Sequence, residues 1–255
     1  MENNLLEKDA IVFLGLMAIA SKKLDVQFTH PDGVITHTNG LNIFAAVIDN
    51  IDGEVIGQQH NSIHAFCNPM LHAEQLTLKE AIDRLNHKRP RVPKTTSVET
   101  YYREYLFNTP NSIGNFDVGA TIYTTLEPCP FCTSALLVSR MKRIVYIIPD
   151  ALYGKSYSYL KETYYKKYDM TYSQLSLGKP KSTLMEFADK QFQTLMAYVQ
   201  ANPTMNGTLY LDLMQDFLSE CKNHFLSLQE SDLLTIGTAK DNNLNTLTGL
   251  QSKAS

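Results

Sequence analysis

The 255-residue chain has few cysteines, no tryptophan and no excess of positive charge. Four cysteines in a chain of this length exclude a disulfide-rich scaffold and indicate a reducing compartment. Lysine and arginine total 23 against 26 acidic residues, which gives a net charge of −3. That balance argues against a broad surface for polyanions such as nucleic acids, because such surfaces need clustered positive charge.

The chain also lacks an apolar run that could span a membrane. Residues 10–20 are apolar but too few to cross a bilayer. The residues before this run include Glu2, Glu7 and Asp9 with only Lys8 positive, which is the wrong charge for a signal peptide. We therefore expect a core-facing helix over residues 10–24 with Asp9 as its N-cap, no membrane association and a cytoplasmic location.

Two short motifs carry the chemistry: His72-Ala73-Glu74 and Pro128-Cys129-Pro130-Phe131-Cys132. An imidazole nitrogen and two thiolates suit Zn²⁺, so His72, Cys129 and Cys132 are candidate zinc ligands. Three protein ligands leave a fourth position for water, which is typical of a catalytic zinc site. Glu74 would then be a general acid/base next to the metal.

A closed structural zinc site is the alternative to this interpretation. It would need a further cysteine pair, whereas the two remaining cysteines, Cys67 and Cys221, stand alone in the sequence. The residues after each motif favour helices, and Pro128 suggests a helix that starts at Cys129. Both helix N-termini would then point at the metal and favour its thiolate ligands.

The H-x-E and P-C-x-x-C motifs resemble the signature of the cytidine deaminase-like superfamily, and the resemblance covers about residues 10–155. Residues 124–129 look most like the branch that holds tRNA adenosine deaminases and guanine deaminases. The resemblance implies zinc at His72, Cys129 and Cys132, and Glu74 as the proton shuttle. It also implies a contact between Asn61 and the base or sugar, and a homo-oligomeric assembly.

One departure from the family pattern leaves the substrate open. Many members have Asn-Pro-x-Gly-Ala where residues 42–46 of this chain read Asn-Ile-Phe-Ala-Ala. The reaction that the resemblance implies is hydrolytic deamination of a small nucleobase or nucleoside. A purine such as guanine is the favoured substrate, and cytosine or cytidine is the next. The alternatives are adenosine in tRNA, which makes nucleic acid a less favoured partner, and a non-catalytic zinc-stabilised binding module.

Short apolar strands that alternate with helices predict an α/β fold with a partly parallel sheet. The resemblance narrows this to a three-layer α/β/α sandwich of the cytidine deaminase-like type with a C-terminal helical extension. We expect a deaminase domain over 1–155, a helical extension over 156–235 and a disordered tail over 236–255. The expected strands are 44–48, 54–57, 119–126 and 143–148, and the expected helices are 73–87, 129–141, 183–200 and 208–229.

Two segments do not fit the core pattern. Residues 88–118 form an insertion that is either a lid or phosphate-recognising arm, or a solvated excursion that orders at an oligomer contact. The second interpretation is favoured for its charge pattern. Residues 153–172 hold seven tyrosines, which favour helix packing over the stacking of bases.

Overall fold

The computed structural model of the chain describes residues 2–24, 27–29, 35–37, 43–63, 66, 68–88, 97, 119–163, 170–203, 209–234 and 237–255. The predicted insertion therefore lies outside the described residues, apart from its two positions 88 and 97. Among the described residues no helix is both long enough and apolar enough to cross a membrane.

A five-stranded mixed sheet in the order β4-β3-β5-β6-β7 forms the centre of the fold. Its strands are β3 (Phe44–Asp49), β4 (Val55–His60), β5 (Ala120–Leu126), β6 (Arg143–Ile148) and β7 (Thr171–Gln174). β3 pairs antiparallel with β4 and β5, whereas β5–β6 and β6–β7 are parallel. The predicted partly parallel sheet is therefore confirmed, and β7 is an edge strand that the sequence pattern did not predict.

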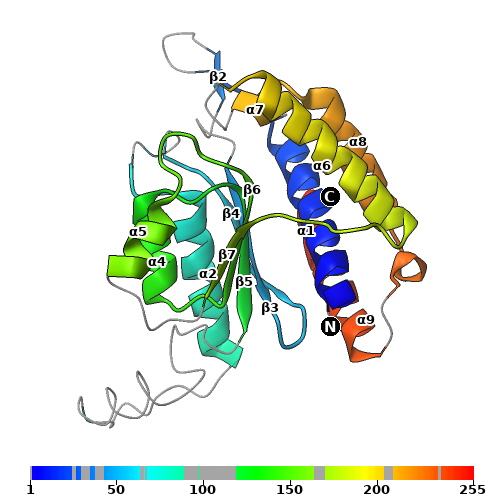
Figure 1. Cartoon of the computed structure of the whole chain (residues 1–255), viewed down its shortest axis with the longest axis horizontal. Coiled ribbons are helices and arrows are strands. Elements are labelled where there is room, and N and C mark those ends of the chain that lie inside the picture. Colours follow the sequence, from blue (N-terminus) through cyan, green and yellow to red (C-terminus); the bar gives the residue numbers. More distant parts are fainter. Residues whose placement is uncertain are drawn as a thin grey trace.

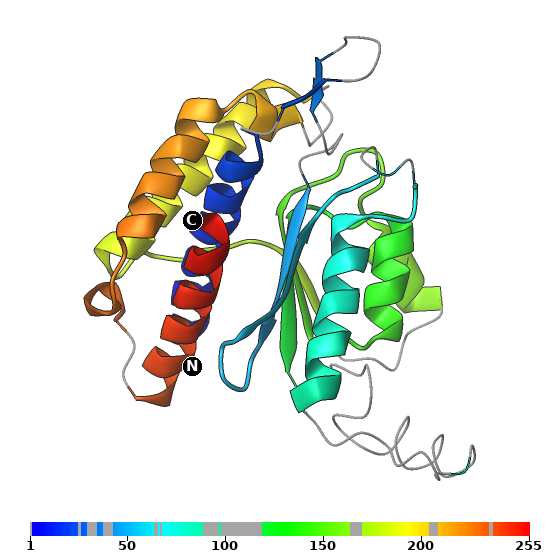
Figure 2. The same ribbon diagram turned by 180° about the vertical axis from the view of Figure 1, so that it is seen from behind.

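Helices cover both faces of this sheet (Figures 1 and 2). On one face lie α2 (Ala73–Lys88), α4 (Pro130–Val138) and α5 (Ser156–Thr163), which we call the front layer. On the other face lie α1 (Glu2–Leu24), α6 (Thr183–Ala201), α8 (Gln215–Ser227) and α9 (Thr238–Ala254), which we call the rear layer. The predicted three-layer α/β/α sandwich is confirmed. Short elements complete the description: β1 (Gln27–Thr29), β2 (Ile35–His37), α7 (Leu209–Asp212) and a 3₁₀ turn at Glu230–Asp232.

Helix α1 lies between the sheet and the helices α6 and α8, with α9 beside it (Figures 1 and 2). Every residue from Ala10 to Ala20 is buried, as expected for a helix that is apolar on all sides. It packs against α6, α8, α9 and β3. The prediction of a core-facing helix is confirmed, and its apolar character follows from its central position.

The prediction of Asp9 as an N-cap is wrong, because α1 begins at Glu2 and continues through Asp9. Asp9 is instead buried and makes two hydrogen-bonded ion-pair contacts of 2.7 and 2.6 Å with Arg143 of β6. The Tyr123 hydroxyl donates a further hydrogen bond of 2.6 Å to Asp9. Burial and the Asp9 charge raise the pKa of Tyr123 well above its usual value, so the hydroxyl remains a donor. This buried group attaches α1 to the sheet.

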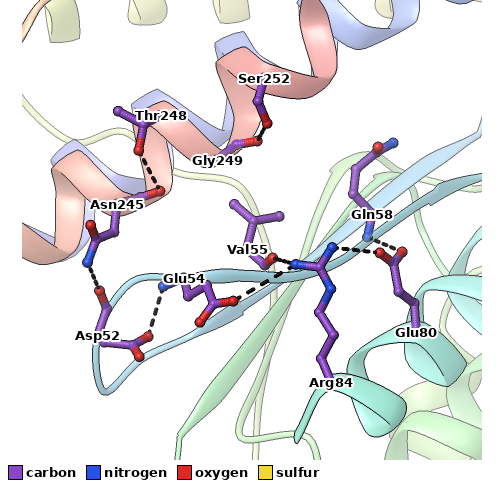
Figure 3. A network of polar contacts seen from close by, with 10 residues as sticks. All are labelled: Asp52, Glu54, Val55, Gln58, Glu80, Arg84, Asn245, Thr248, Gly249 and Ser252. Carbon is purple, nitrogen blue, oxygen red and sulfur yellow. Dashed lines mark hydrogen bonds and ion pairs between the residues drawn. The ribbon is translucent and has the colours of Figure 1, made fainter. Parts of the chain in front are cut away.

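The expected disordered tail at 236–255 is also wrong, because residues 238–254 form α9. Its polar side chains bind the β3–β4 turn, which is far away in sequence. Asn242 donates to the Ile51 carbonyl, Asn245 to the Asp52 carbonyl and Thr246 to the Gly53 carbonyl, at 3.0, 2.9 and 2.7 Å. Figure 3 shows the Asn245 contact beside the hairpin. The polar side chains of this segment, which led to the prediction of a disordered tail, therefore donate hydrogen bonds to the β3–β4 turn.

The outer edge of β4 is closed by side chains of α2 (Figure 3). Glu80 accepts a 2.9 Å hydrogen bond from the Gln58 backbone N–H, and Arg84 donates one of 2.9 Å to the Val55 carbonyl. Arg84 also forms an i,i+4 ion pair with Glu80. Because these side chains satisfy edge groups that a neighbouring strand would otherwise bind, the edge is protected from strand addition.

The division of the chain into a deaminase domain that ends at residue 155 and a helical extension that follows it stays a prediction.

The Asp9–Arg143 pair gives a stability prediction. Arg143→Met leaves the Asp9 carboxylate buried without its cation, so we expect the free energy of unfolding to fall by about 3–5 kcal/mol. Lys240→Met breaks the more exposed ion pair with Glu230 and is the control, with an expected change below about 1 kcal/mol. Urea unfolding of the zinc-loaded proteins measures both. Equal changes would contradict the role of the buried pair.

Candidate metal centre and acid/base site

His72 lies at the start of α2. The chain leaves β4 after His60, and the Leu76 N–H donates a 3.1 Å hydrogen bond to the His72 carbonyl, which makes His72 the residue that begins the helix. Glu74 falls in the first turn of α2 and is 3% exposed. A carboxylate in this position is favoured by the positive end of the helix dipole. The local sequence thus places a metal-binding imidazole and a carboxylate at one helix end.

The two cysteines lie at the start of α4, which follows β5. Cys129 is the N-cap, and its carbonyl accepts a 2.8 Å hydrogen bond from the Thr133 N–H. The proline at the first helical position is Pro130, so the predicted role of Pro128 at the helix start is wrong. Cys132 is one turn into the helix and fully buried. A three-residue separation brings both thiols to the same side of α4.

The fold brings the three predicted ligands together. His72 Nδ1 lies 3.8 Å from Cys129 Sγ, and one donor atom from each of His72, Cys129 and Cys132 lies within 4.8 Å of the others. One nitrogen and two sulfur donors fit Zn²⁺, which such a set binds as a tetrahedron with one further position. Among the described residues this is the one group with metal-binding spacing. It does not include His60 or His224.

The cluster favours a thiolate without any metal. Hydrogen bonds from Cys132 and His72 lower the pKa of Cys129 to about 4. The hydrogen bond with Cys129 raises the pKa of His72 and, together with burial, that of Cys132. The cluster therefore holds Cys129 ready as a metal ligand, and a metal that binds both sulfurs displaces the Cys132 proton. Burial raises the pKa of Glu74 to about 7, within range for a group that exchanges a proton near neutral pH.

Two predicted site residues are buried with unpaired polar atoms. Glu74 Oε2 has no hydrogen-bond partner among the described residues, and neither do Asn61 Oδ1 and Nδ2. Asn61 is fully buried directly after β4, where its backbone N–H donates to the Ile43 carbonyl at 2.9 Å. Leaving a buried polar group unpaired costs about 1–3 kcal/mol. These atoms are therefore suited to bind a polar ligand.

The motifs alone did not single out two further residues near the cluster. The Phe131 ring lies edge-on to the His72 imidazole with 5.7 Å between centroids, and it is 40% exposed. Its position between the two cysteines was the available signal. Glu127 is buried and lies two residues before Cys129. In the sequence it stood out only as part of residues 124–129. Tyr157 and Tyr172 stack on each other at 4.4 Å, which agrees with the packing interpretation for these two tyrosines.

Comparison with known proteins agrees with this geometry. Residues 36–148 match the family described as the cytidine and deoxycytidylate deaminase zinc-binding region. The matched range contains the sheet strands β3 to β6 and all the predicted site residues. The matched range spans less than half of the chain and contains the His–Cys–Cys group, so this part of the chain is similar to that family's zinc-binding region.

The curated relatives include two tRNA-specific adenosine deaminases. The one from Aquifex aeolicus is 33% identical over 103 residues, which is 40% of this chain and 50% of the relative. The one from Bacillus subtilis is 31% identical over 96 residues, which is 38% of this chain and 43% of the relative. The chain thus spans about half the length of these curated relatives.

Solved structures with a similar fold have lower identity. A structure from studies of A-to-I editing by tRNA:A34 deaminases is 22% identical and covers 52% of this chain and 82% of its own, with a TM-score of 0.36. Guanine deaminase from Bacillus subtilis is 19% identical and covers 61% and 80%, with a TM-score of 0.31.

The metal centre gives a binding prediction. Cys129→Ala and Cys132→Ala each remove one of three protein ligands, so zinc content should fall from about one ion per chain to a small fraction of that. Cys221→Ala is the control, because Cys221 is a buried free cysteine of α8 outside the cluster, and it should keep its zinc. Elemental analysis after dialysis against a weak chelator measures the ratio. Full zinc content in Cys129→Ala would rule out the assigned ligand set.

Proposed function

We propose that the chain removes an exocyclic amino group from a nucleobase by zinc-dependent hydrolysis, with release of ammonia. The observation that carries this proposal is Glu74: a buried carboxylate with an unpaired oxygen, two residues from one metal ligand. A structural zinc site has no use for such a group, and leaving it unpaired destabilises the fold. A hydrolytic site needs it as a proton carrier.

Bound zinc supplies water that loses a proton near neutral pH. Glu74 accepts that proton and passes it to a ring nitrogen of the base, and it then carries the second proton of the added water from the new hydroxyl to the departing amine. The amine-bearing ring carbon gains an oxygen and loses its nitrogen as ammonia, so one water is consumed for each amino group released.

Asn61 is proposed to orient the substrate. Its side chain offers one acceptor and one donor, both buried and unpaired among the described residues. This pair complements the polar edge of a base or the hydroxyl of a sugar. Because one face of the substrate would be read by an uncharged amide, the contact adds selectivity without adding charge to the site.

The substrate class has two candidates. A free base or nucleoside agrees with the acidic balance of the chain, which does not favour a polyanion. Adenosine in tRNA is the second candidate, supported by the names of the relatives and by exposed apolar side chains in segments next to the ligands, namely Phe66, Met70 and Phe131. A homo-oligomer and a cytoplasmic location are proposed with either substrate.

The proposed reaction is tested with Glu74→Gln. This variant keeps the size of the side chain but cannot carry the proton, so we expect kcat to fall by about 10²–10⁴ while the zinc content stays unchanged. Glu186→Gln in the first turn of α6 is the control and should keep full activity. Ammonia release is measured against free bases, nucleosides, nucleotides and unmodified tRNA.

The substrate panel separates the candidates. Release from a base or nucleoside, with a KM that changes little with salt, supports the small-molecule substrate. Release from tRNA alone, with a KM that rises steeply with salt, supports the second candidate. Full zinc content with no release from any panel member would contradict the proposed function.

The Asn61 role is tested with Asn61→Leu. The amide makes no side-chain hydrogen bond among the described residues, so its removal should leave the melting temperature equal or higher. Loss of a substrate contact should lower kcat/KM by roughly 10- to 100-fold. Asn243→Leu is the control: Asn243 is equally buried but donates a 2.8 Å hydrogen bond to Glu7, so the variant should lose stability and keep its KM. An unchanged kcat/KM in Asn61→Leu would argue against substrate contact.

A further inference from the structure

Glu127 has a buried carboxylate that the reaction above does not use. The residue is 6% exposed and precedes Pro128 and Cys129. Three donors bind its carboxylate. The Lys155 N–H donates to Oε1 at 2.9 Å, the Asp150 N–H to Oε2 at 3.1 Å, and the Tyr172 hydroxyl to Oε1 at 3.3 Å. Two of these donors are the backbone ends of the turn over residues 150–155, which follows β6.

This turn is shaped around the Glu127 carboxylate. The Asp150 side chain accepts the N–H groups of Leu152 and Tyr153 at 2.8 and 3.0 Å. A Cβ at Gly154 would lie 2.3 Å from Glu127 Oε2 and equally close to the Asp150 carbonyl, so only glycine fits there. Lys155 has a positive φ of 66°, which is unusual for a residue other than glycine. The backbone is held in one conformation that wraps the carboxylate.

The same turn is joined to the metal-ligand segment. The Ser156 hydroxyl, at the end of the turn, donates a 3.3 Å hydrogen bond to the Pro128 carbonyl. The Thr133 hydroxyl donates to the same carbonyl at 3.0 Å and lies 3.2 Å from the Ser156 hydroxyl. Both ends of the turn therefore contact Glu127, and the end at Ser156 also contacts Pro128, which directly precedes Cys129. The conformation of the turn is therefore coupled to that of the segment that carries the metal ligand Cys129.

The tip of this fixed turn carries two large apolar side chains in solvent. Leu152 is 71% exposed and Tyr153 is 60% exposed. Tyr157, just after the turn, is used in packing, since it stacks on Tyr172 and its hydroxyl donates to the Met170 carbonyl at 2.9 Å. A fixed backbone that holds exposed apolar groups and is bonded to the segment before a metal ligand is typical of a binding surface, because such groups gain by covering a ligand.

We propose that Glu127 is a positioning residue: its carboxylate fixes the 150–155 turn against the metal-ligand segment, and the turn borders the substrate opening. The inference rests on the proposed function for the identity of what is bound. Glu127 acts through the turn and touches neither metal nor substrate. Its loss therefore weakens substrate binding and leaves the chemical step intact.

The test uses Glu127→Gln in the full-length zinc-loaded protein. The amide nitrogen replaces one acceptor oxygen, so an N–H at one end of the turn loses its partner. We expect hydrogen exchange of the backbone amides of 150–155 to become at least about tenfold faster. We also expect KM for the deaminated substrate to rise about tenfold, with kcat within about twofold and zinc content unchanged.

Two further variants keep the outcome interpretable. Gly154→Ala displaces the turn from an intact Glu127 carboxylate and should reproduce the higher KM and the faster exchange. Glu7→Gln is the matched control: Glu7 is an equally buried carboxylate that accepts the Leu234 N–H at 2.6 Å and the Asn243 amide at 2.8 Å in the rear layer. It should lose stability without a change in KM or in exchange of the turn.

Each result decides between the parts of the proposal. Unchanged exchange of 150–155 in Glu127→Gln overturns the anchoring. Faster exchange with unchanged KM overturns the link to substrate, and loss of zinc shows that Glu127 supports the ligands instead. A wild-type chain that deaminates nothing overturns the proposed function and the substrate role of the turn with it, while the exchange measurement still tests the anchoring.

Discussion

The approach of two helix N-termini is the constraint on which the rest of the structure depends. His72 and Cys129 are separated by 57 residues, yet their donor atoms are 3.8 Å apart. Each lies at the start of a helix that follows a strand: His72 before α2, which follows β4, and Cys129 before α4, which follows β5. Both helices must therefore lie side by side on one face of the sheet, as Figure 1 shows. The change from antiparallel to parallel pairing at β5 follows, because α4 is the crossover that leads to β6.

Two buried carboxylates of the rear layer are paired, whereas two buried polar side chains of the candidate site are not. The rear layer pairs its buried carboxylates: Glu7 accepts two donors, and Asp9 binds Arg143 and Tyr123. The front layer instead leaves Glu74 Oε2 and the Asn61 amide unpaired among the described residues. Since each unpaired group destabilises the fold, the contrast indicates that these groups are kept for a ligand rather than for stability.

The sequence allowed the site to be predicted because its signal is local in each half. H-x-E and C-x-x-C spacing, followed by helix-forming residues, determine which side chains share a helix end. The structure differs from the sequence-based predictions where contacts between residues far apart in the chain decide the outcome. Asp9 looked like a helix cap, but its partner Arg143 is 134 residues away. Residues 238–254 looked like a polar tail, but their asparagines and Thr246 bind a hairpin about 190 residues earlier. The four-residue β7 gives too short a pattern to be recognised without β6 beside it.

The rear layer explains why the chain carries helices over residues 183–255. The region shared with the family, residues 36–148, supplies the sheet from β4 to β6 and the helices that carry the metal group. It does not supply a cover for α1, which is buried on every side from Ala10 to Ala20. Helices α6, α8 and α9 enclose α1 against the sheet, and α9 also binds the β3–β4 turn (Figure 2). An apolar α1 and a C-terminal helical layer therefore require each other. Because the described site groups all lie on front-layer elements, the extension acts on the site through the sheet that it supports.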